Sequence, residues 1–137
     1  MKIRLDHIGI AVNDLDGGGK FWEILGLQNA GEEVNLEQGV NIRFYDTDEG
    51  EKPARIELLS PTGEDTPIGK FLANKGPGVQ QIAFQVDDLQ GLLNRLKAEG
   101  VRLINETPAS GAHGSRIAFV HPSSTGGVLV ELLEYID

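Results

Sequence analysis

Cysteine is absent from the 137 residues of the sequence. The chain therefore forms neither a disulfide nor a thiolate metal site, and any metal ion must be held by nitrogen and oxygen ligands. This composition fits the reducing cytoplasm, where we expect the protein to reside. The sequence also lacks any stretch of the roughly 20 consecutive apolar residues that a membrane-spanning helix needs, so we expect no membrane segment.

Positive charge is also scarce. The chain has 12 Lys and Arg residues against 21 Asp and Glu residues, which gives a formal net charge of -9. Proteins bind phosphate backbones and anionic membrane surfaces mainly through Lys and Arg side chains, so we expect neither nucleic acid nor a membrane as a partner. The hydrophobic fraction of 39% and the charged fraction of 24% are those of an ordinary globular protein.

The two halves of the chain repeat each other at a shift of 74 positions. The segment that begins at Leu5 aligns with the segment that begins at Val79, and the later segments IELLSP and VELLEY align so that Glu57 falls on Glu131. Further matching pairs are Ile8 with Ile82, Val12 with Val86, Asp14 with Asp88, and Gly26 with Gly100. One unbroken offset predicts two copies of a single supersecondary unit.

Hydrophobic periodicity predicts the order βαβββ in each copy. The predicted elements are a strand at 3–12, a helix at 15–25 and strands at 28–34, 39–46 and 54–60, then a strand at 79–86, a helix from 89 and strands at 102–106, 115–121 and 127–134. A short linker helix at about 66–75, capped by Thr66 and closed by Gly76, separates the copies. We therefore expect one α+β domain over residues 1–137, with module one at about 3–62 and module two at about 77–136.

The two predicted long helices differ in how well the sequence specifies them. In the second, Asp88 can cap the start, Gly100 can end it in the left-handed conformation, and a stripe of leucines can be buried. Those leucines are Leu89, Leu92, Leu93 and Leu96. The first helix has three glycines in its opening turns, each less favourable than Ala by about 1 kcal/mol, so we expect it to depend on packing of Phe21, Trp22 and Leu25 against the sheet.

Polar side chains recur at matching places in the two copies. In the first strand His7 lies on the face opposite Ile8, and Gln81 has the corresponding position in the second copy. Glu57 and Glu131 interrupt the apolar last strands. A lone histidine in a strand is more often a hydrogen-bonded structural residue than a ligand, but the repeat favours convergence of all four side chains on one cavity.

A cation resolves the charge conflict that such a cavity would have. Two carboxylates in a semi-buried site repel each other unless a cation lies between them. One imidazole, one amide and two carboxylates suit a divalent ion such as cobalt, zinc, manganese, nickel or magnesium rather than copper(I). The sequence therefore predicts a divalent metal site formed by His7, Glu57, Gln81 and Glu131, and it does not identify the ion.

The repeated unit, with a polar residue on the first and last strands of each copy, resembles the vicinal oxygen chelate superfamily, which includes glyoxalase I, extradiol dioxygenases and antibiotic-binding proteins. Within it, four segments resemble the methylmalonyl-CoA epimerase family. They are DHIGIAVNDL from Asp6, LEQGVNIRF from Leu36, IELLSPTGEDTPIGKFL from Ile56 and GAHGSRIAFVHPSSTGGVLVEL from Gly111. The resemblance covers almost the whole chain and implies an eight-stranded, open, barrel-like sheet with helices outside, in a protein that forms homodimers.

The resemblance also assigns roles to individual residues. It implies that His7 and Glu131 are metal ligands and that Glu57 stands where the family has a Glu or Gln ligand. Glu37 matches a second catalytic carboxylate beside Glu131. The chain departs from the family at Gln81, which occupies the position of a His ligand; an amide oxygen is a weaker donor than imidazole towards zinc or cobalt.

The implied activity is interconversion of (2R)- and (2S)-methylmalonyl-CoA, an acyl-CoA substrate, through an enolate that the metal stabilises. Inversion needs a base on one face of the carbon and an acid on the other, and Glu37 and Glu131 are the two candidates. His113 is a candidate contact for substrate or coenzyme A, with a plain surface role as the alternative, whereas His121 is interpreted as structural. Two other functions stay open, a glyoxalase I type lactoylglutathione lyase and a non-enzymatic ligand-binding protein on the same fold.

Overall fold

The computed structural model describes residues 2–47 and 52–136, which divide into two compact units. The N-terminal unit comprises residues 7–80, and the C-terminal unit comprises residues 1–6 and 81–137. The chain passes from one unit to the other within strand β1 (Ile3–Ala11) and again within strand β5 (Gly78–Val86). The division into modules expected from the sequence stays a prediction.

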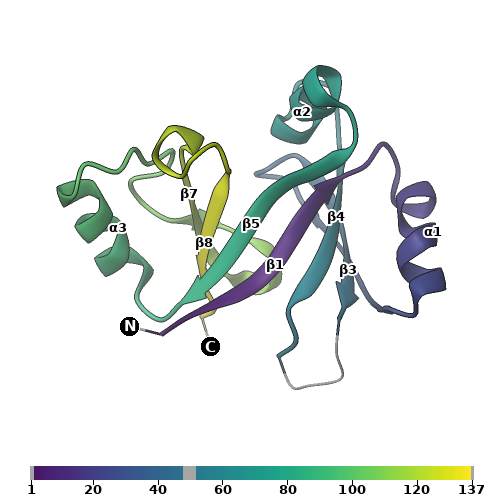
Figure 1. Cartoon of the computed structure of the whole chain (residues 1–137), viewed down its shortest axis with the longest axis horizontal. Coiled ribbons are helices and arrows are strands. Elements are labelled where there is room, and N and C mark those ends of the chain that lie inside the picture. Colours follow the sequence, from purple (N-terminus) through teal and green to yellow (C-terminus); the bar gives the residue numbers. More distant parts are fainter. Residues whose placement is uncertain (1, 48–51, 137) are drawn as a thin grey trace. The chain divides into compact units, whose positions relative to one another are not determined.

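In the N-terminal unit the strands are hydrogen-bonded in the order β2-β3-β4-β1 (Figure 1). After β1, its elements are α1 (Leu15–Leu25), β2 (Gln28–Asn35), β3 (Val40–Asp46), β4 (Arg55–Pro61) and α2 (Pro67–Lys75). Strands β1 and β4 are parallel, whereas β2, β3 and β4 pair antiparallel. Helix α1 packs against β3 and β4.

In the C-terminal unit the strands are hydrogen-bonded in the order β5-β8-β7-β6. Its elements after β5 are α3 (Leu89–Ala98), β6 (Ala109–Ser110), the short 3-10 helix η1 (Ala112–Gly114), β7 (Arg116–Val120), the short 3-10 helix η2 (Pro122–Ser124) and β8 (Val130–Glu134). The apolar side of α3 joins the sheet in one cluster of buried side chains. That cluster comprises Val86, Leu89, Leu92, Leu93, Ala118, Val120 and Leu132.

The repeat seen in the sequence reappears in the strand pairing. In the N-terminal unit β1 pairs with β4 so that Ile8 lies opposite Ile56, and in the C-terminal unit β5 pairs with β8 so that Ile82 lies opposite Val130. Both members of the second pair lie 74 positions after those of the first. The predicted α+β fold class with two βαβββ units is confirmed.

The offset is not unbroken, however. Phe44 of β3 lies opposite Glu57, and Phe119 of β7 lies opposite Glu131. The glutamates are 74 positions apart and the phenylalanines 75, so the connection to the last strand is one residue shorter in the second copy. A gapless alignment hides this correspondence because it pairs Phe44 with Ala118 rather than with Phe119.

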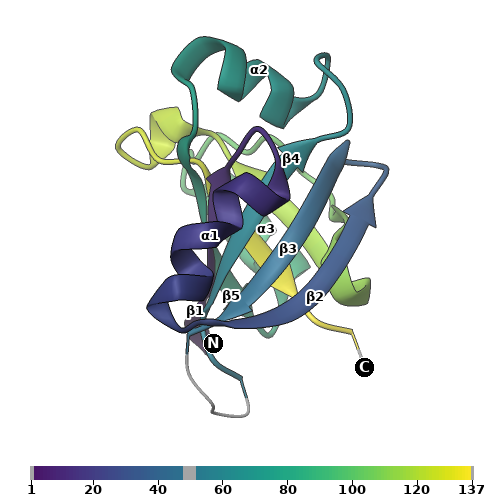
Figure 2. The ribbon, with the colours of Figure 1, turned by 90° about the vertical axis from the view of Figure 1, so that its right-hand side faces the viewer.

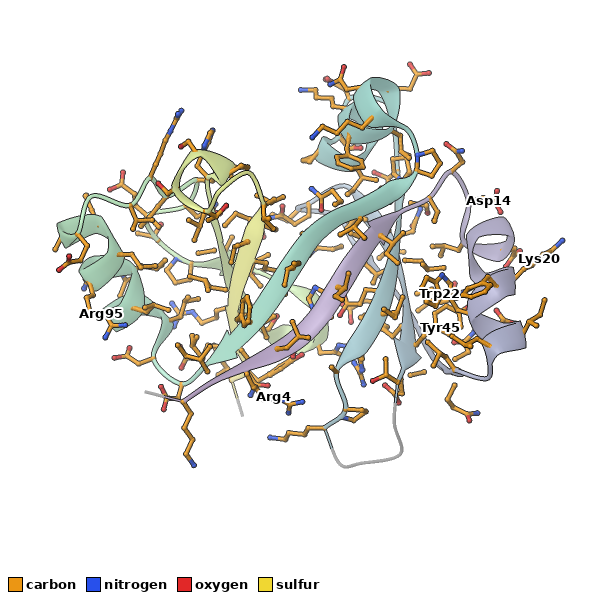
Figure 3. The ribbon with its side chains drawn as sticks, in the orientation of Figure 1. Arg4, Asp14, Lys20, Trp22, Tyr45 and Arg95 are labelled. Atoms are coloured by element: carbon orange, nitrogen blue, oxygen red, sulfur yellow. The ribbon has the colours of Figure 1, made fainter. Side chains whose placement is uncertain are left out.

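Helix α1 is held differently from the expectation. Phe21 and Leu25 are 61% and 59% exposed, so these two side chains do not pack against the sheet. Trp22 does, together with Leu15, and the two pack on a buried cluster that includes Tyr45. Figure 3 shows Trp22 and Tyr45 between the helix and the sheet, with Lys20 on the outer side.

Figure 2 shows α1 in front of the strands, and the glycines at its start explain how the helix packs so closely on them. A Cβ atom added to Gly18 would lie 2.6 Å from Cγ1 of Val12, and one added to Gly19 would overlap the hydroxyl of Tyr45. The side chain of Asp14 also accepts a hydrogen bond from the Gly17 amide at 2.6 Å and caps the helix. Low helix propensity is therefore offset by close packing and a cap.

The strand predicted at 102–106 is wrong. Only a single bridge, from Leu103 to Val120, forms there, and the short edge strand lies later, at Ala109–Ser110. The side chain of Asn105 accepts a hydrogen bond from the amide of Phe119 at 2.8 Å. A side chain thus satisfies a donor that a continuous ladder would satisfy with a carbonyl.

The other helix signals are confirmed. Asp88 accepts a hydrogen bond from the Gly91 amide at 3.1 Å, and Gly100 has the left-handed φ of 85° just after α3. Thr66 caps α2 by accepting from the Gly69 amide at 3.0 Å. Within residues 2–47 and 52–136, none of the helices is long and apolar enough to cross a membrane.

Candidate functional site

The N-terminal unit contains a buried pair of polar side chains, His7 and Glu57. Glu57 lies opposite Gly9 in the parallel β1–β4 pair, and His7 precedes Gly9 by two residues, so both side chains are on one face of the sheet. The Nδ1 atom of His7 is 3.0 Å from Oε2 of Glu57. The two residues are 4% and 5% exposed, so their pairing compensates part of the cost of removing them from water.

The C-terminal unit contains the equivalent pair, Gln81 and Glu131. Glu131 lies opposite Ala83, two residues after Gln81, so the pair again shares a face. The Nε2 atom of Gln81 donates a hydrogen bond to Oε1 of Glu131, and both residues are 7% exposed. In each unit, therefore, the first-strand residue contacts the carboxylate of the last strand.

His7 and Gln81 occupy matching places in β1 and β5, as inferred from the sequence, and the structure adds that each contacts the glutamate of the last strand in its own unit. Buried imidazole, amide and carboxylate groups without any thiolate are a donor set that suits a divalent cation. Convergence of the two pairs on one ion, and the ligand role of each residue, stay predictions.

An aromatic ring lies beside each glutamate. Phe44 is 1% exposed and opposite Glu57, and Phe119 is opposite Glu131. In the N-terminal unit the guanidinium carbon of Arg55 also lies 5.4 Å from the centre of the Phe44 ring. Sequence reasoning missed Arg55. Side chains alternate between the two faces of a strand, so Arg55, two residues before Glu57 in β4, lies on the same face as Glu57.

Glu37, the predicted second catalytic carboxylate, is exposed in the turn between β2 and β3. The turn is supported from one side, because a Cβ atom added to Gly39 would lie 2.6 Å from Cγ2 of Thr66 at the start of α2. The Thr62 amide also donates to the Gly39 carbonyl at 3.0 Å. The turn therefore rests against α2, and the catalytic role of Glu37 stays a prediction.

The two later histidines occupy different settings. His113 is exposed in η1 and has a φ of 57°, a left-handed conformation that non-glycine residues adopt rarely. His121 is half-buried, and its Nδ1 accepts a hydrogen bond from the Ser123 amide at 3.0 Å, which caps η2. The structural interpretation of His121 is confirmed, whereas contact of His113 with substrate or coenzyme A stays a prediction.

A charged network on the other face of the N-terminal sheet fixes α1. Arg43 contacts the carboxylates of Asp16 at 2.7 Å and Glu32 at 2.6 Å, and it donates to the Leu15 carbonyl at 3.1 Å. The hydrogen bond with Asp16, the largest cause, raises the pKa of Arg43 although burial opposes it. The guanidinium is therefore permanently charged and fully engaged, and it serves structure rather than chemistry.

Comparison with known proteins places the chain in a family. Residues 6–119 match the model of the Glyoxalase/Bleomycin resistance protein/Dioxygenase superfamily. The chain belongs to this superfamily. The expectation from the repeated unit and its polar pairs, that the chain is a glyoxalase-like protein, is confirmed.

Several relatives of the chain in this superfamily are methylmalonyl-CoA epimerases. The chain is 41% identical over 132 residues to the mitochondrial methylmalonyl-CoA epimerase of Homo sapiens, covering 94% of this chain and 72% of that protein. It is 36% identical to the ethylmalonyl-CoA/methylmalonyl-CoA epimerase of Cereibacter sphaeroides, covering 94% and 96%. A methylmalonyl-CoA epimerase solved in complex with methylmalonyl-CoA and NH4+ is 39% identical, covers 98% and 95% of the two chains, and has a TM-score of 0.92. The predicted resemblance to these epimerases is confirmed.

Proposed function

We propose that the chain is an epimerase that interconverts (2R)- and (2S)-methylmalonyl-CoA with the help of a divalent metal ion. The observation that carries the proposal is the matched pair of buried polar side chains in the two units, His7 with Glu57 and Gln81 with Glu131. Support also comes from relatives named as methylmalonyl-CoA epimerases, to which this chain is similar over nearly its whole length.

His7, Glu57, Gln81 and Glu131 are the residues that would hold the ion. A divalent ion would stabilise the negative charge that develops on the substrate carbonyl when the α-proton leaves. The pairs themselves orient the donors: the imidazole of His7 is fixed by Glu57, and the carboxylate of Glu131 is fixed by the amide of Gln81. Such fixed, buried donors lose little entropy when a cation binds.

Proton transfer is assigned to Glu37 and Glu131. One carboxylate removes the proton from the α-carbon, the electron pair of the C–H bond passes to the enolate, and the carboxylic acid on the other face returns a proton to the same carbon. No net change in charge or oxidation state results. Burial suits Glu131 to act away from water, whereas the exposed turn of Glu37 lets that side chain exchange protons with solvent.

One relative supports a second function. The chain is 29% identical over 133 residues to the lactoylglutathione lyase of Haemophilus influenzae. That reaction does not need a base on the opposite face of the carbon, so an enzyme of this kind would stay active after Glu37→Gln. Turnover of the methylglyoxal–glutathione hemithioacetal by this variant would favour the second function, and its absence favours the epimerase.

The proposal is tested by hydrogen exchange at the α-carbon of methylmalonyl-CoA in deuterium oxide, followed by NMR. We expect the purified protein to catalyse both exchange and inversion, a chelator to stop them, and added divalent ion to restore them. Glu37→Gln and Glu131→Gln should each slow inversion by about 100-fold or more, since general acid–base groups contribute about that factor. Glu64→Gln, which changes an exposed carboxylate in a loop, is the matched control and should keep the original rate.

Exchange that persists unchanged in the presence of the chelator would remove the metal from the proposal. Absence of exchange with every divalent ion tried would remove the epimerase itself, and would leave a non-enzymatic ligand-binding protein as the function of this fold.

A further inference from the structure

Arg55 lies on the same sheet face as the N-terminal polar pair. It is the first residue of β4 and lies opposite His7 in the parallel pair with β1. Glu57 follows two residues later, so the three side chains share a face. In the second copy the position corresponding to Arg55 is occupied by Leu129, 74 positions later. The positively charged side chain at this position is therefore present in the first copy of the repeat and not in the second.

Two neighbours hold the guanidinium of Arg55 in place. Its Nε donates a hydrogen bond to Oδ1 of Asp46 at 2.9 Å, and its Cζ lies 5.4 Å from the centre of the Phe44 ring. The ring is buried and lies opposite Glu57. An arginine over an aromatic face, with one edge bound to a carboxylate, is pre-organised and keeps its other edge for a ligand.

The other edge of the guanidinium is available. Among residues 2–47 and 52–136, no acceptor forms a hydrogen bond with Nη1 or Nη2 of Arg55. The side chain is 27% exposed, so solvent or a ligand reaches it. Arg43 differs: its side chain is 10% exposed, it contacts Asp16 and Glu32, and it belongs to the face that α1 covers.

The overall charge of the chain makes such a cation important. A protein with a formal net charge of -9 repels an acyl-CoA, which carries phosphates and, in a malonyl ester, a carboxylate as well. Binding therefore requires local positive charge beside the reacting groups. Arginine binds planar or tetrahedral oxyanions through two parallel N–H donors, and Nη1 and Nη2 can provide them.

We propose that Arg55 binds an anionic group of the substrate, a carboxylate or a phosphate, on the face that carries His7 and Glu57. The inference rests on the proposed acyl-CoA epimerase function and deepens it, because it names a residue that selects anionic acyl thioesters. Asp46 and Phe44 fix the orientation of the guanidinium and do not themselves contact the ligand.

The test compares Arg55→Gln with Arg55→Lys and with Arg95→Gln. Arg95 is an exposed residue of α3, labelled in Figure 3, and its replacement changes the net charge by the same amount. We expect Arg55→Gln to raise KM for methylmalonyl-CoA by about ten- to a hundredfold, the range of a charged hydrogen bond, with kcat changed much less. Arg55→Lys keeps the charge but not the two parallel donors, so its KM should fall between those of wild type and Arg55→Gln. Arg95→Gln should match wild type.

Methylmalonyl-pantetheine, which lacks the phosphates of coenzyme A, separates the two anionic groups. If the KM penalty of Arg55→Gln persists with this substrate, Arg55 binds the carboxylate. If the penalty disappears, Arg55 binds a phosphate. Equal KM values for Arg55→Gln and Arg95→Gln with both substrates would overturn the proposal.

Calorimetric binding of coenzyme A and of methylmalonyl-pantetheine needs no turnover and keeps this test independent of the epimerase reaction. If wild type binds either compound but catalyses no exchange, weaker binding by Arg55→Gln supports the anion site while the proposed function fails. If exchange occurs and neither binding nor KM changes, the proposed function stands and the anion site fails. Circular dichroism spectra of the variants check that they are folded. If Arg55→Gln does not fold, the comparison of Arg55→Lys with wild type still tests the proposal.

Discussion

At the scale of single residues, the most informative difference between the two copies is His7 against Gln81. Both side chains are buried and both contact the glutamate of the last strand. In the copy with Gln81 the amide nitrogen donates to Glu131, so its carbonyl oxygen is the atom suited to a cation. One half thus offers an imidazole and the other an amide oxygen, which favours harder ions.

We predict that Gln81→His raises the affinity of the protein for zinc and cobalt by about tenfold or more, because imidazole is the better donor towards these ions. Titration calorimetry with each ion measures the change. Gln80→His is the matched control, because Gln80 lies on the other face of β5, and its affinity should equal that of wild type. An unchanged affinity in Gln81→His would show that position 81 does not face the ion.

At the scale of elements, the attachment of α1 shows where sequence patterns mislead. The apolar residues Phe21, Trp22 and Leu25 look like one stripe, but only Trp22 packs against the sheet, and polar groups complete the attachment. The Tyr45 hydroxyl donates to Glu23 at 2.5 Å, and Arg43 contacts several carboxylates and a carbonyl. Hydrophobic periodicity does not register hydrogen bonds, so it did not indicate this network.

Tyr45 makes this attachment depend on pH. Burial, the largest cause, raises the pKa of Tyr45, and the hydrogen bond to Glu23 raises it further. The folded protein therefore holds the phenolic proton more tightly than the unfolded chain does. The contribution of Tyr45 to the free energy of unfolding is fully present below the ordinary tyrosine pKa of about 10. It is lost as the pH rises through the raised pKa of the folded state.

Urea unfolding at a series of pH values checks this expectation. The free energy of unfolding of wild type should fall more steeply above about pH 10 than that of Tyr45→Phe, which has no proton to lose. Parallel curves for the two proteins would mean that Tyr45 ionises equally well in the folded and unfolded states.

Element positions followed from the sequence wherever local chemistry decides them. Asp88 and Thr66 were recognisable as caps because their side chains accept from amides three residues later. The strand expected at 102–106 was wrong because the Asn105 side chain replaces a ladder bond there. This replacement depends on the amide of Phe119, which is distant in the sequence from Asn105, so no local pattern reveals it.

At the scale of the whole molecule, duplication is the principle that the sequence revealed best. The shift of 74 located His7, Gln81, Glu57 and Glu131, and strand parity placed His7 and Gln81 on corresponding faces of the first strands, whereas the contact of each with a glutamate came from the structure. The shift did not reveal that Phe44 and Phe119 correspond, because the copies differ by one residue in a loop. Arg55 was missed for the opposite reason: it has no polar counterpart in the second copy, so a search for repeated residues passes over it.

Homodimer formation and the barrel-like arrangement implied by the family resemblance remain expectations. Neither is needed for the main proposal, that the two buried pairs serve a single divalent ion. A shared ion requires donors from both copies, so replacement of a donor in either copy must affect the same binding event.

The most direct test of that claim is the metal stoichiometry of the purified protein, measured by mass spectrometry of the metal after dialysis against a divalent ion. The account predicts one ion per chain in wild type, and loss of that ion in both His7→Ala and Glu131→Ala. Two ions per chain, or retention of the ion when only one pair is disrupted, would contradict it.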